Sequence, residues 1–572
     1  MTNKPTITFV TVCKARLAHL MQSLPAAAAQ APCVVVDYAC PEATGNWVRA
    51  NHPAVTVVGI GTTGRFSVAA GRNAGAAAAA TDWLCFLDAD VIPASNFVEA
   101  LTLLLRPGRF YRPLPVTEDT WGTLLCTRTD FERIGGYDEA FEEWGGEDDD
   151  IYLRLQSSGV TAAHYPAHLL SAITHDDSVR MQFHVVKDRE ISRRVNFAYM
   201  QLRNDIRTML DTEPGLPLRR AVFSEVRRVL SASLPAGSDA RISVDLPDAV
   251  LLPGWNAARA LVYTLPPSPL TPPLSDARGS MQLRNITDRP QMPFIVGTGR
   301  CGSTLLRLML DSHPALAIPD EAIFMRDLVR AAMQGAGIDE LMTVLVSHHS
   351  WKSFGLDARE VRARLTSTGG PPLAAVLRAF YDCYATRFSK SRSGDKTIVN
   401  TQYIASLAAV LPEARFIHLV RDGRDVAVSM RGLWFGMDNL ADAAAYWATT
   451  ILHARSAIDS SRCLEIRYED LVADPESALR RICEFIELSW DPKMLDYHVR
   501  AADRLAESPD GIAWDGTRVP AIETNRAHAL TKQPPTKARV GTWKNTLTSD
   551  EVTQFELLAG PVLATLGYET ST

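Results

Sequence analysis

The 572-residue sequence contains no long apolar run, and this absence narrows the classes of protein to which it can belong. No stretch approaches the roughly 18 consecutive apolar residues that a membrane-spanning helix needs. The first apolar run, residues 7–12, is too short for a secretory signal peptide and lacks a cleavage site. The sequence therefore predicts a cytoplasmic protein without a transmembrane segment.

Clusters of positive charge and patterned cysteines are also missing. The net charge is −6 without a polybasic stretch, which argues against nucleic acid as a partner. The nine cysteines are scattered, and none has a Cys-x-x-Cys or Cys/His spacing suited to zinc. We expect free, mostly buried thiols in a reducing compartment. A chain of this length should hold two or three domains.

The first informative stretch combines an apolar run, a glycine-rich turn and a helical pattern. Residues 294–296 predict a buried strand, residues 297–302 a turn, and residues 303–310 a helix. Such a unit places backbone N–H groups and the positive end of a helix around one anion. The spacing Gly-x4-Gly followed by Ser303 and Thr304 is that of a phosphate-binding loop, but Ser303 replaces the lysine of nucleoside triphosphatases. The loop suits a bound 5′-phosphate; the alternative is an ordinary strand–helix turn.

A second apolar strand, residues 416–420, runs into a turn that contains Arg421, and Ser429 follows eight residues later. Together with the loop above, this pattern resembles the sulfotransferases that use 3′-phosphoadenosine 5′-phosphosulfate (PAPS). Residues 539–544, Arg-Val-Gly-Thr-Trp-Lys, resemble the segment that closes the nucleotide pocket in that family. The resemblance implies a P-loop-like domain with a parallel sheet. Its implied PAPS-binding residues are Gly299, Arg300, Cys301, Gly302, Ser303, Thr304, Arg421, Ser429, Arg539 and Gly541.

The resemblance also implies catalytic groups for sulfuryl transfer. Glu321 stands where tyrosylprotein sulfotransferases have a catalytic glutamate, and Asp320 is the neighbouring alternative. His313 is a further alternative because small-molecule sulfotransferases use a histidine, although its place before a proline favours a turn. Lys396 would stabilise charge on the transferring group, together with Arg300. We also expect positive charge for the anionic nucleotide from Arg300, Arg421 and Arg424.

The amino-terminal part alternates short apolar strands with helical patterns, which predicts a largely parallel α/β sheet with ligands at the carboxyl ends of its strands. Asp37 ends one predicted strand, and Asp88 and Asp90 follow another, residues 83–87. Two carboxylates at a strand end suit Mn²⁺ or Mg²⁺, which would neutralise a leaving nucleoside diphosphate. An isolated Asp-x-Asp can also be a solvated turn.

Residues 144–150 read Trp-Gly-Gly-Glu-Asp-Asp-Asp and precede a helical pattern. A helix amino terminus favours acidic residues, but this does not explain the Trp-Gly-Gly. The motif resembles the acceptor site of β1,4-galactosyltransferase-like enzymes, and the segment around Arg72 resembles family-2 glycosyltransferases, which share the GT-A fold. The resemblance implies that Asp148 deprotonates the acceptor hydroxyl and that Glu147 holds the acceptor sugar.

The same resemblance implies how a UDP-sugar is held in this Rossmann-like domain. Asp37 would contact the uracil, and Arg72 would lie near the nucleotide. Asp88 and Asp90 would form the metal motif. His175 would be a third metal ligand, unless it is an ordinary solvated histidine.

We therefore expect an α/β chain of two domains: a GT-A glycosyltransferase domain at residues 1–205, a helical extension and Pro-rich linker at residues 206–289, and a sulfotransferase domain at residues 290–572. The expected function is inverting, metal-dependent sugar transfer from a UDP-sugar and metal-free sulfuryl transfer from PAPS, with a carbohydrate hydroxyl as acceptor. The alternatives are protein tyrosine as the sulfuryl acceptor, one active half with a glycan-binding partner half, or a scaffold derived from two decayed enzymes.

Overall fold

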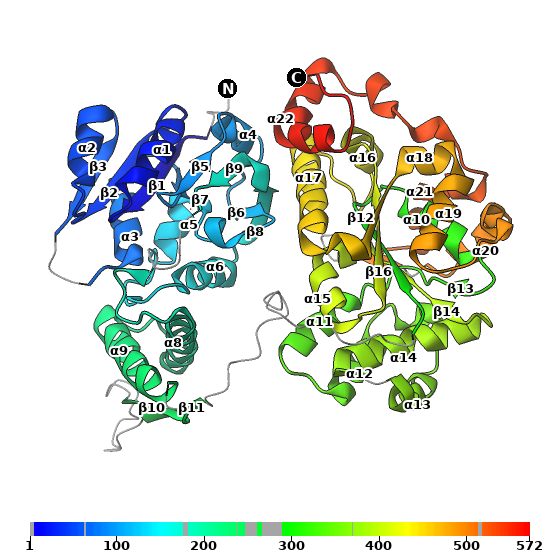
Figure 1. Cartoon of the computed structure of the whole chain (residues 1–572), viewed down its shortest axis with the longest axis horizontal. Helices are drawn as coiled ribbons and strands as arrows, with labels where there is room; N and C mark the ends of the chain where they lie inside the picture. The colour runs from blue at the N-terminus through cyan, green and yellow to red at the C-terminus, as the bar shows by residue number, and fades with distance from the viewer. Residues whose placement is uncertain are drawn as a thin grey trace. The chain divides into compact units, whose positions relative to one another are not determined.

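The computed structural model describes residues 5–571 except residues 62–64, 175–180, 236, 246–259, 266–288, 369, 509 and 513–516. The chain forms two compact units, Met1–Thr271 and Pro272–Thr572 (Figure 1). Each unit has its own sheet and its own apolar core. The predicted Pro-rich linker lies almost entirely outside the described residues, and the predicted domain limits at 205/206 and 289/290 stay predictions.

The first unit contains a seven-stranded sheet of order β3-β2-β1-β4-β7-β6-β8. Strands β3, β2, β1 and β4 run parallel, as do β6 and β8, whereas β7 is antiparallel to both neighbours. β-Branched and aromatic residues dominate these strands, as expected for a sheet covered on both faces. The predicted α/β class is confirmed. The strands are β1 Ile7–Cys13, β2 Cys33–Tyr38, β3 Thr56–Ile60, β4 Trp83–Phe86, β6 Arg109–Leu114, β7 Leu124–Thr127 and β8 Thr161–Pro166, with a separate pair β5 Val91–Pro93 and β9 Leu170–Ala172.

Helix α3 (Val68–Ala78) packs unusually close to this sheet. A Cβ atom on Gly75 would lie 2.4 Å from Val10 Cγ1, and one on Gly71 would lie 2.8 Å from Val12 Cγ1. Because both valines belong to β1, larger residues would push the helix away and displace Arg72, which lies between the two glycines. The other helices beside this sheet are α1 Leu17–Ala28, α2 Thr44–Asn51, α4 Phe97–Thr102, α5 Arg128–Arg133 and α6 Glu147–Ser157.

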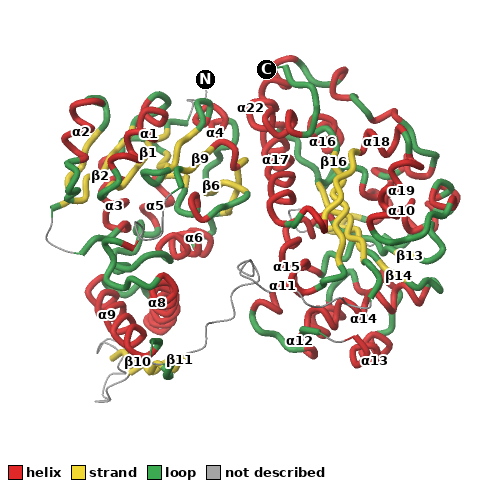
Figure 2. Tube along the Cα trace, in the orientation of Figure 1, coloured by secondary structure: helices red, strands yellow, loops and turns green. Residues whose placement is uncertain are grey.

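The first unit continues into two long helices and a hairpin. Figure 2 shows α8 (Arg189–Leu210) and α9 (Leu216–Ser233) beside each other, with β10 (Ala240–Asp245) and β11 (Ala260–Leu265) at their end. Apolar residues of the two helices form a buried cluster together with Phe141, which lies in the loop before α6. The sequence predicted a helical extension within residues 206–289 but no strand there, because the hairpin strands are short and half-exposed.

The second unit contains a four-stranded, entirely parallel sheet of order β15-β12-β16-β17. Its two central strands are buried, and apolar clusters cover both faces, so that the strand sequences are almost continuously apolar. The strands predicted at residues 294–296 and 416–420 are confirmed. The strands of this sheet are β12 Met292–Gly297, β15 Asp395–Lys396, β16 Ala414–Val420 and β17 Cys463–Arg467, with short pairs β13 Leu316–Ala317 with β14 Arg392–Ser393 and β18 Gly511–Ile512 with β19 Arg518–Val519.

Helices surround this second sheet (Figure 1). Those that carry site residues are α10 (Ser303–Asp311), which follows β12, and α16 (Gly423–Met430), which follows β16. None of the helices that the structure describes has both the length and the apolar character needed to cross a bilayer. The remaining helices are α11 Met325–Met333, α12 Ile338–Ser347, α13 Ala358–Thr368, α14 Pro372–Arg387, α15 Ile404–Val410, α17 Leu440–Ala457, α18 Tyr468–Ala473, α19 Pro475–Phe485, α20 Ala501–Leu505, α21 Ala521–Ala527 and α22 Ser549–Thr565.

Candidate active sites

In the first unit, three predicted site residues meet around one buried guanidinium group. Arg72 donates to Asp148 at 2.6 Å and to Asp88 at 2.9 Å, and its guanidinium lies 3.8 Å from the carboxylate of Glu147. The ring of Tyr137 lies 4.9 Å from the same guanidinium. The structure thus brings together the end of β4, the middle of α3 and the start of α6, at the edge of the sheet where ligands were expected.

The carboxylates at the start of α6 are buried, and burial shifts their ionisation. Burial and the neighbouring Asp148 raise the pKa of Glu147 to about 8. Burial also raises the pKa of Asp148, but the ion pair with Arg72 opposes this rise. The two adjacent carboxyl groups therefore differ: Glu147 holds its proton at neutral pH, whereas Arg72 favours the ionised form of Asp148. Such a pair can supply one proton acceptor and one neutral hydrogen-bond donor.

The predicted metal ligands follow β4 as expected but already contact arginines. The side chain of Asp88 is 44% exposed beside Arg72, and Asp90 accepts a hydrogen bond from Arg16 at 2.8 Å. Their oxygen atoms are of the kind that Mn²⁺ and Mg²⁺ prefer. His175 lies outside the described residues, and within those residues no three His, Cys, Asp or Glu side chains cluster as a metal site.

Asp37 ends β2, where the sequence placed it, and orders the turn that follows. Its two carboxylate oxygens accept the N–H groups of Cys40 and Gly45, both at 2.8 Å. This fixes the carboxylate at the carboxyl edge of the sheet. Contact with a uracil stays a prediction.

In the second unit, the predicted phosphate loop has the backbone geometry that the motif requires. Arg300 and Gly302 both have positive φ, 66° and 101°. A Cβ atom on Gly302 would lie 2.5 Å from the ring of Tyr468, so glycine is needed there for space as well as for conformation. Gly302 caps α10, and Ser303 and Thr304 form its first turn. The N–H groups in the first turn of a helix have no acceptor within the helix, so a turn of this kind can bind an anion.

Arginines dominate the surroundings of this loop. Arg300 donates to Ser429 Oγ at 3.1 Å and to the carbonyl of Ala527 at 2.9 Å, and no carboxylate among the described residues forms an ion pair with it. Arg421 donates to the carbonyl groups of Arg300 at 3.0 Å and Arg539 at 2.5 Å. Burial and the charges of Arg421 and Arg539 lower the pKa of Arg300 to about 10. These arginines therefore carry positive charge that a bound anion would neutralise.

A cavity of about 160 Å³ lies among these arginines. Its lining includes the predicted residues Arg300, Gly302, Ser303, Thr304, Arg421, Ser429 and Arg539. Cys301 is buried in the apolar core beside the loop, and the N–H of Gly299 donates to Tyr446 Oη at 2.9 Å. These two therefore support the loop rather than line the cavity. The cavity has the charge and hydrogen-bond donors needed for a phosphorylated ligand.

Lys396 brings the two predicted acidic residues together. Its ammonium donates to Glu321 at 3.0 Å and to Asp320 at 3.1 Å. Although burial alone would raise the pKa of Asp320, Lys396 and Arg307 hold it far below the usual range, and Ser508 also bonds this carboxylate. The side chain of Glu321 is 39% exposed. Glu321 is thus the carboxylate that a substrate can reach, whereas Asp320 is held in a buried network.

The structure also shows the surroundings of His313 and Arg424, two further residues that the sequence analysis singled out. Both ring nitrogens of His313 bond backbone groups, of Ser489 at 2.8 Å and Ala315 at 3.0 Å, in agreement with a structural turn. The expectation that Arg424 supplies charge to the nucleotide is wrong. Arg424 is buried and bonds Asp422 and Glu556, at 2.9 and 2.8 Å, so its charge is neutralised inside the protein.

The predicted closing segment is held against α16. Gly541 and Trp543 donate their N–H groups to Asp425 at 2.7 and 2.9 Å, and the Trp543 ring lies 3.8 Å from the Arg424 guanidinium. One cavity residue that the sequence did not indicate is His528, whose pKa is lowered to about 3 by burial and by Arg300. Nothing in its local sequence marks it, because its neighbours come from distant segments.

Three family models match the chain. Residues 38–110 match "Glycosyl transferase family 2", residues 109–177 match "N-terminal domain of galactosyltransferase", and residues 293–492 match "Sulfotransferase family". The resemblance of each half to these families is therefore confirmed.

Similar proteins with curated descriptions or solved structures include three examples. Protein-tyrosine sulfotransferase 2 of Gallus gallus is 26% identical over 296 residues, 49% of this chain and 70% of that protein. A sulfotransferase domain from the curacin biosynthetic pathway is 21% identical, with a TM-score of 0.33, over 50% of this chain and 100% of that domain. The mannosyltransferase PcManGT from Pyrobaculum calidifontis is 18% identical, with a TM-score of 0.28, over 41% of this chain and 76% of that one. The family models alone indicate a glycosyltransferase-family segment and a sulfotransferase-family segment in one chain, which supports transferase activity.

Proposed function

We propose that the chain transfers a sugar from a UDP-sugar at the site around Arg72 and a sulfuryl group from PAPS at the site around Arg300. The observation that carries this proposal is the opposite character of the two sites. One gathers carboxylates after β4 and at the start of α6 around the buried Arg72, and the other gathers arginines around a cavity beside a phosphate loop. The matched family models support the same division.

For sugar transfer, we assign Asp148 as the base and Glu147 as a donor to the acceptor sugar. The ion pair with Arg72 favours the ionised form of Asp148, which would take the proton of the acceptor hydroxyl as that oxygen bonds to the anomeric carbon. The bond from the anomeric carbon to the diphosphate breaks on the opposite side, with inversion, and UDP leaves. Glu147, with its pKa of about 8, is neutral at pH 7 and can donate a hydrogen bond.

Asp88 and Asp90 are the described residues that would hold Mn²⁺ or Mg²⁺. Asp88 keeps a partly open carboxylate beside Arg72, and both residues offer hard oxygen donors. A bound divalent cation supplies positive charge that stabilises the leaving diphosphate. His175 stays a proposed additional ligand. Asp37 and Arg72 are proposed to hold the nucleotide.

For sulfuryl transfer, we assign Glu321 as the base. The acceptor oxygen attacks sulfur, the bond from sulfur to the bridging 5′-phosphate oxygen breaks, and Glu321 takes the hydroxyl proton. The leaving 3′-phosphoadenosine 5′-phosphate carries the developing negative charge, which Arg300 and Lys396 stabilise. Ser429 and Arg421 are proposed to bind the 3′-phosphate and the first turn of α10 to bind the 5′-phosphosulfate, in a loop that Gly299 and Cys301 support.

A carbohydrate hydroxyl is the proposed sulfuryl acceptor, because the same chain carries a galactosyltransferase-like domain. Peptide tyrosine is the second candidate, since similar curated proteins are protein-tyrosine sulfotransferases. Mass spectrometry of candidate glycans and tyrosine peptides, incubated with a UDP-sugar panel and PAPS, tests both. We expect a glycan that gains a sugar and then a sulfuryl group. Sulfation of the peptide alone would overturn the carbohydrate assignment, and no product with any donor would overturn the function.

A further inference from the structure

Helix α8 carries a stripe of buried polar side chains on one face. Ser192, Asn196, Tyr199 and Arg203 are spaced by four, three and four residues, which places them along one side of a helix. The first three are fully buried and Arg203 is 6% exposed. Buried polar groups are costly unless each finds a partner, so their partners show what this face is for.

The first half of the stripe holds the turn that leads into Glu147. Ser192 and Asn196 both donate to the carbonyl of Trp144, at 3.0 Å each. The amide of Asn196 also bonds the carbonyl groups of Glu143 and Gly145. At Gly146, with φ of 98°, a Cβ atom would lie 2.8 Å from Asn196 Cβ. The Trp-Gly-Gly turn is therefore shaped to fit against α8.

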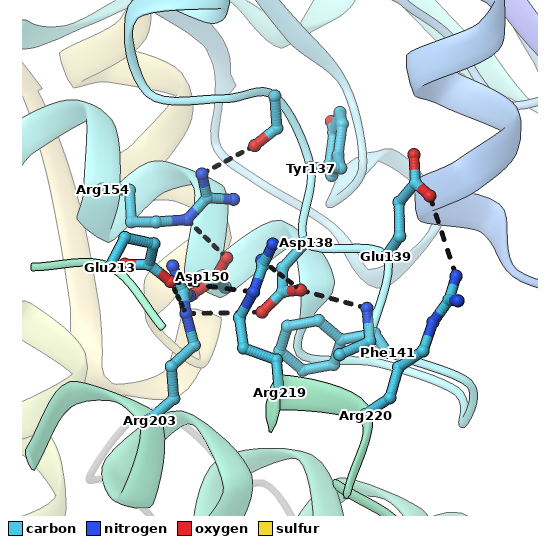
Figure 3. Close-up of polar contacts among 12 residues, drawn as sticks. Tyr137, Asp138, Glu139, Phe141, Asp150, Arg154, Arg203, Glu213, Arg219 and Arg220 are labelled. Atoms are coloured by element: carbon cyan, nitrogen blue, oxygen red, sulfur yellow. Dashed lines mark hydrogen bonds and ion pairs between the residues drawn. The ribbon is translucent and has the colours of Figure 1, made fainter. Parts of the chain in front are cut away.

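The second half of the stripe joins the two segments that flank the Arg72 centre (Figure 3). Arg203 donates to Asp150 of α6 at 2.5 Å and lies 3.4 Å from the carboxylate of Asp138. Tyr199 Oη and Arg219 of α9 each bond Asp138 at 2.6 Å. Asp138 follows Tyr137, whose ring contacts Arg72, and Asp150 lies two residues after Asp148. One guanidinium thus links both sides of the centre.

We propose that Arg203 is a positioning residue for sugar transfer, and that the polar face of α8 sets the placement of Glu147 and Asp148 relative to Arg72. The proposal rests on the proposed function of this site. Arg203 contacts neither Arg72 nor Asp148, so it acts through Asp150 and Asp138. The rigid planar fork of an arginine can hold two carboxylates at fixed angles, which a lysine ammonium cannot do.

The test compares Arg203→Met and Arg203→Lys with Arg220→Met in the full chain. Arg220 is the matched control, because it also reaches a carboxylate, Glu139 at 3.9 Å, but is 54% exposed. We expect Arg203→Met to lower kcat for sugar transfer about 10–100-fold with little change in KM for the UDP-sugar, since a small displacement of a catalytic group has effects of this size. Arg203→Lys should restore only part of the loss, and Arg220→Met should match wild type.

A second readout does not depend on activity. Hydrogen–deuterium exchange should become faster in the peptide that covers residues 143–150 in Arg203→Met and stay unchanged in Arg220→Met. Circular dichroism and thermal unfolding of the same preparations report whether the unit that contains Arg203 has folded. If Arg203→Met fails to fold, Ser192→Ala removes a single hydroxyl, and we expect the same pattern with a smaller loss of kcat.

The outcomes separate the two proposals. Wild-type kcat and unchanged exchange in the folded variants would overturn the positioning role. A rise in KM alone, without a fall in kcat, would also overturn it, because it would indicate a role in donor binding. If the wild-type chain transfers no sugar at all, the proposed function fails, and the exchange experiment still decides whether Arg203 holds the 143–150 segment.

Discussion

The two sites share an architecture and differ in charge. In each, parallel strands end at a polar edge, and a glycine-containing turn leads into a helix whose amino terminus carries site residues. In the first unit, one buried arginine is shared among Asp88, Glu147 and Asp148. In the second, Arg300 has hydroxyl and carbonyl partners, and the charges of Arg421 and Arg539 lie near it.

This difference shows in opposite pKa shifts. Burial raises the pKa of Glu147 to about 8 and lowers that of Arg300 to about 10, so each site disfavours its own charge. A bound cation would stabilise the carboxylate charge of the first site, and a bound anion would stabilise the arginine charge of the second. With the proposed anionic donors, we therefore expect the first site to need an added cation and the second site to need none.

Removal of divalent cations should separate the two activities most strongly. We expect EDTA to abolish sugar transfer and to leave sulfuryl transfer unchanged, because only the first site depends on a cation for its diphosphate. Asp90→Asn should reproduce the loss for sugar transfer alone. Both activities are measured in one preparation; equal loss of the two would contradict the contrast between the sites.

Asp148→Asn should have the next largest effect. The substitution keeps size but removes the proton acceptor, and general-base catalysis contributes about 10²–10⁴-fold. We expect kcat for sugar transfer to fall by that range while binding of the UDP-sugar, measured by calorimetry, barely changes. A variant with the wild-type rate would show that Asp148 is not the base.

Glu321→Gln tests the base of the second site. We expect sulfuryl transfer to fall at least about 10²-fold while PAPS still binds, because Lys396 and the arginines remain in place. A sugar hydroxyl is harder to deprotonate than a tyrosine, whose pKa is about 10, so the loss should be greater with a glycan acceptor. Glu484→Gln, at an exposed glutamate of α19, is the control, and its rate of sulfuryl transfer should equal that of the wild type. Wild-type sulfuryl transfer by Glu321→Gln would show that Glu321 is not the base.

The pH dependence of the two activities should differ at the alkaline side. In the proposed mechanism Glu147 acts with its proton in place, so we expect the rate of sugar transfer to fall about tenfold per pH unit above the pKa of about 8. Glu147→Gln stays neutral and should remove this decline. Sulfuryl transfer should persist until pH approaches 10, where Arg300 begins to lose its charge. Identical alkaline profiles for both activities would argue against the assignment of Glu147.

Short-range features of both sites could be predicted from the sequence, and long-range ones could not. The carboxylates after β4 and the glycine turn before α10 lie within consecutive residues, so their chemistry and local structure are encoded together. The charge of Arg424 was misjudged because its partner Glu556 lies 132 residues further along the chain. His528 and Arg203 were missed for the same reason, since only tertiary packing brings them to a site.

The smallest expected effect concerns the cysteines, which also differ between the sites. Cys40 is half-buried beside Asp37, and hydrogen bonds from Cys13, Thr44 and the N–H of Ala15 lower its pKa to about 5. The pKa of each of the other eight cysteines is raised. Burial raises that of Cys301, in the phosphate loop, to about 11. Because the thiolate is the reactive form, iodoacetamide at pH 7 should label Cys40 first.

The label adds bulk next to the proposed uracil site, so we expect a rise of a few-fold in KM for the UDP-sugar. We expect no effect on sulfuryl transfer, and we expect UDP to protect Cys40 from labelling. Peptide mapping decides the matter: if Cys301 is labelled as fast as Cys40, the electrostatic contrast between the two sites does not extend to their thiols.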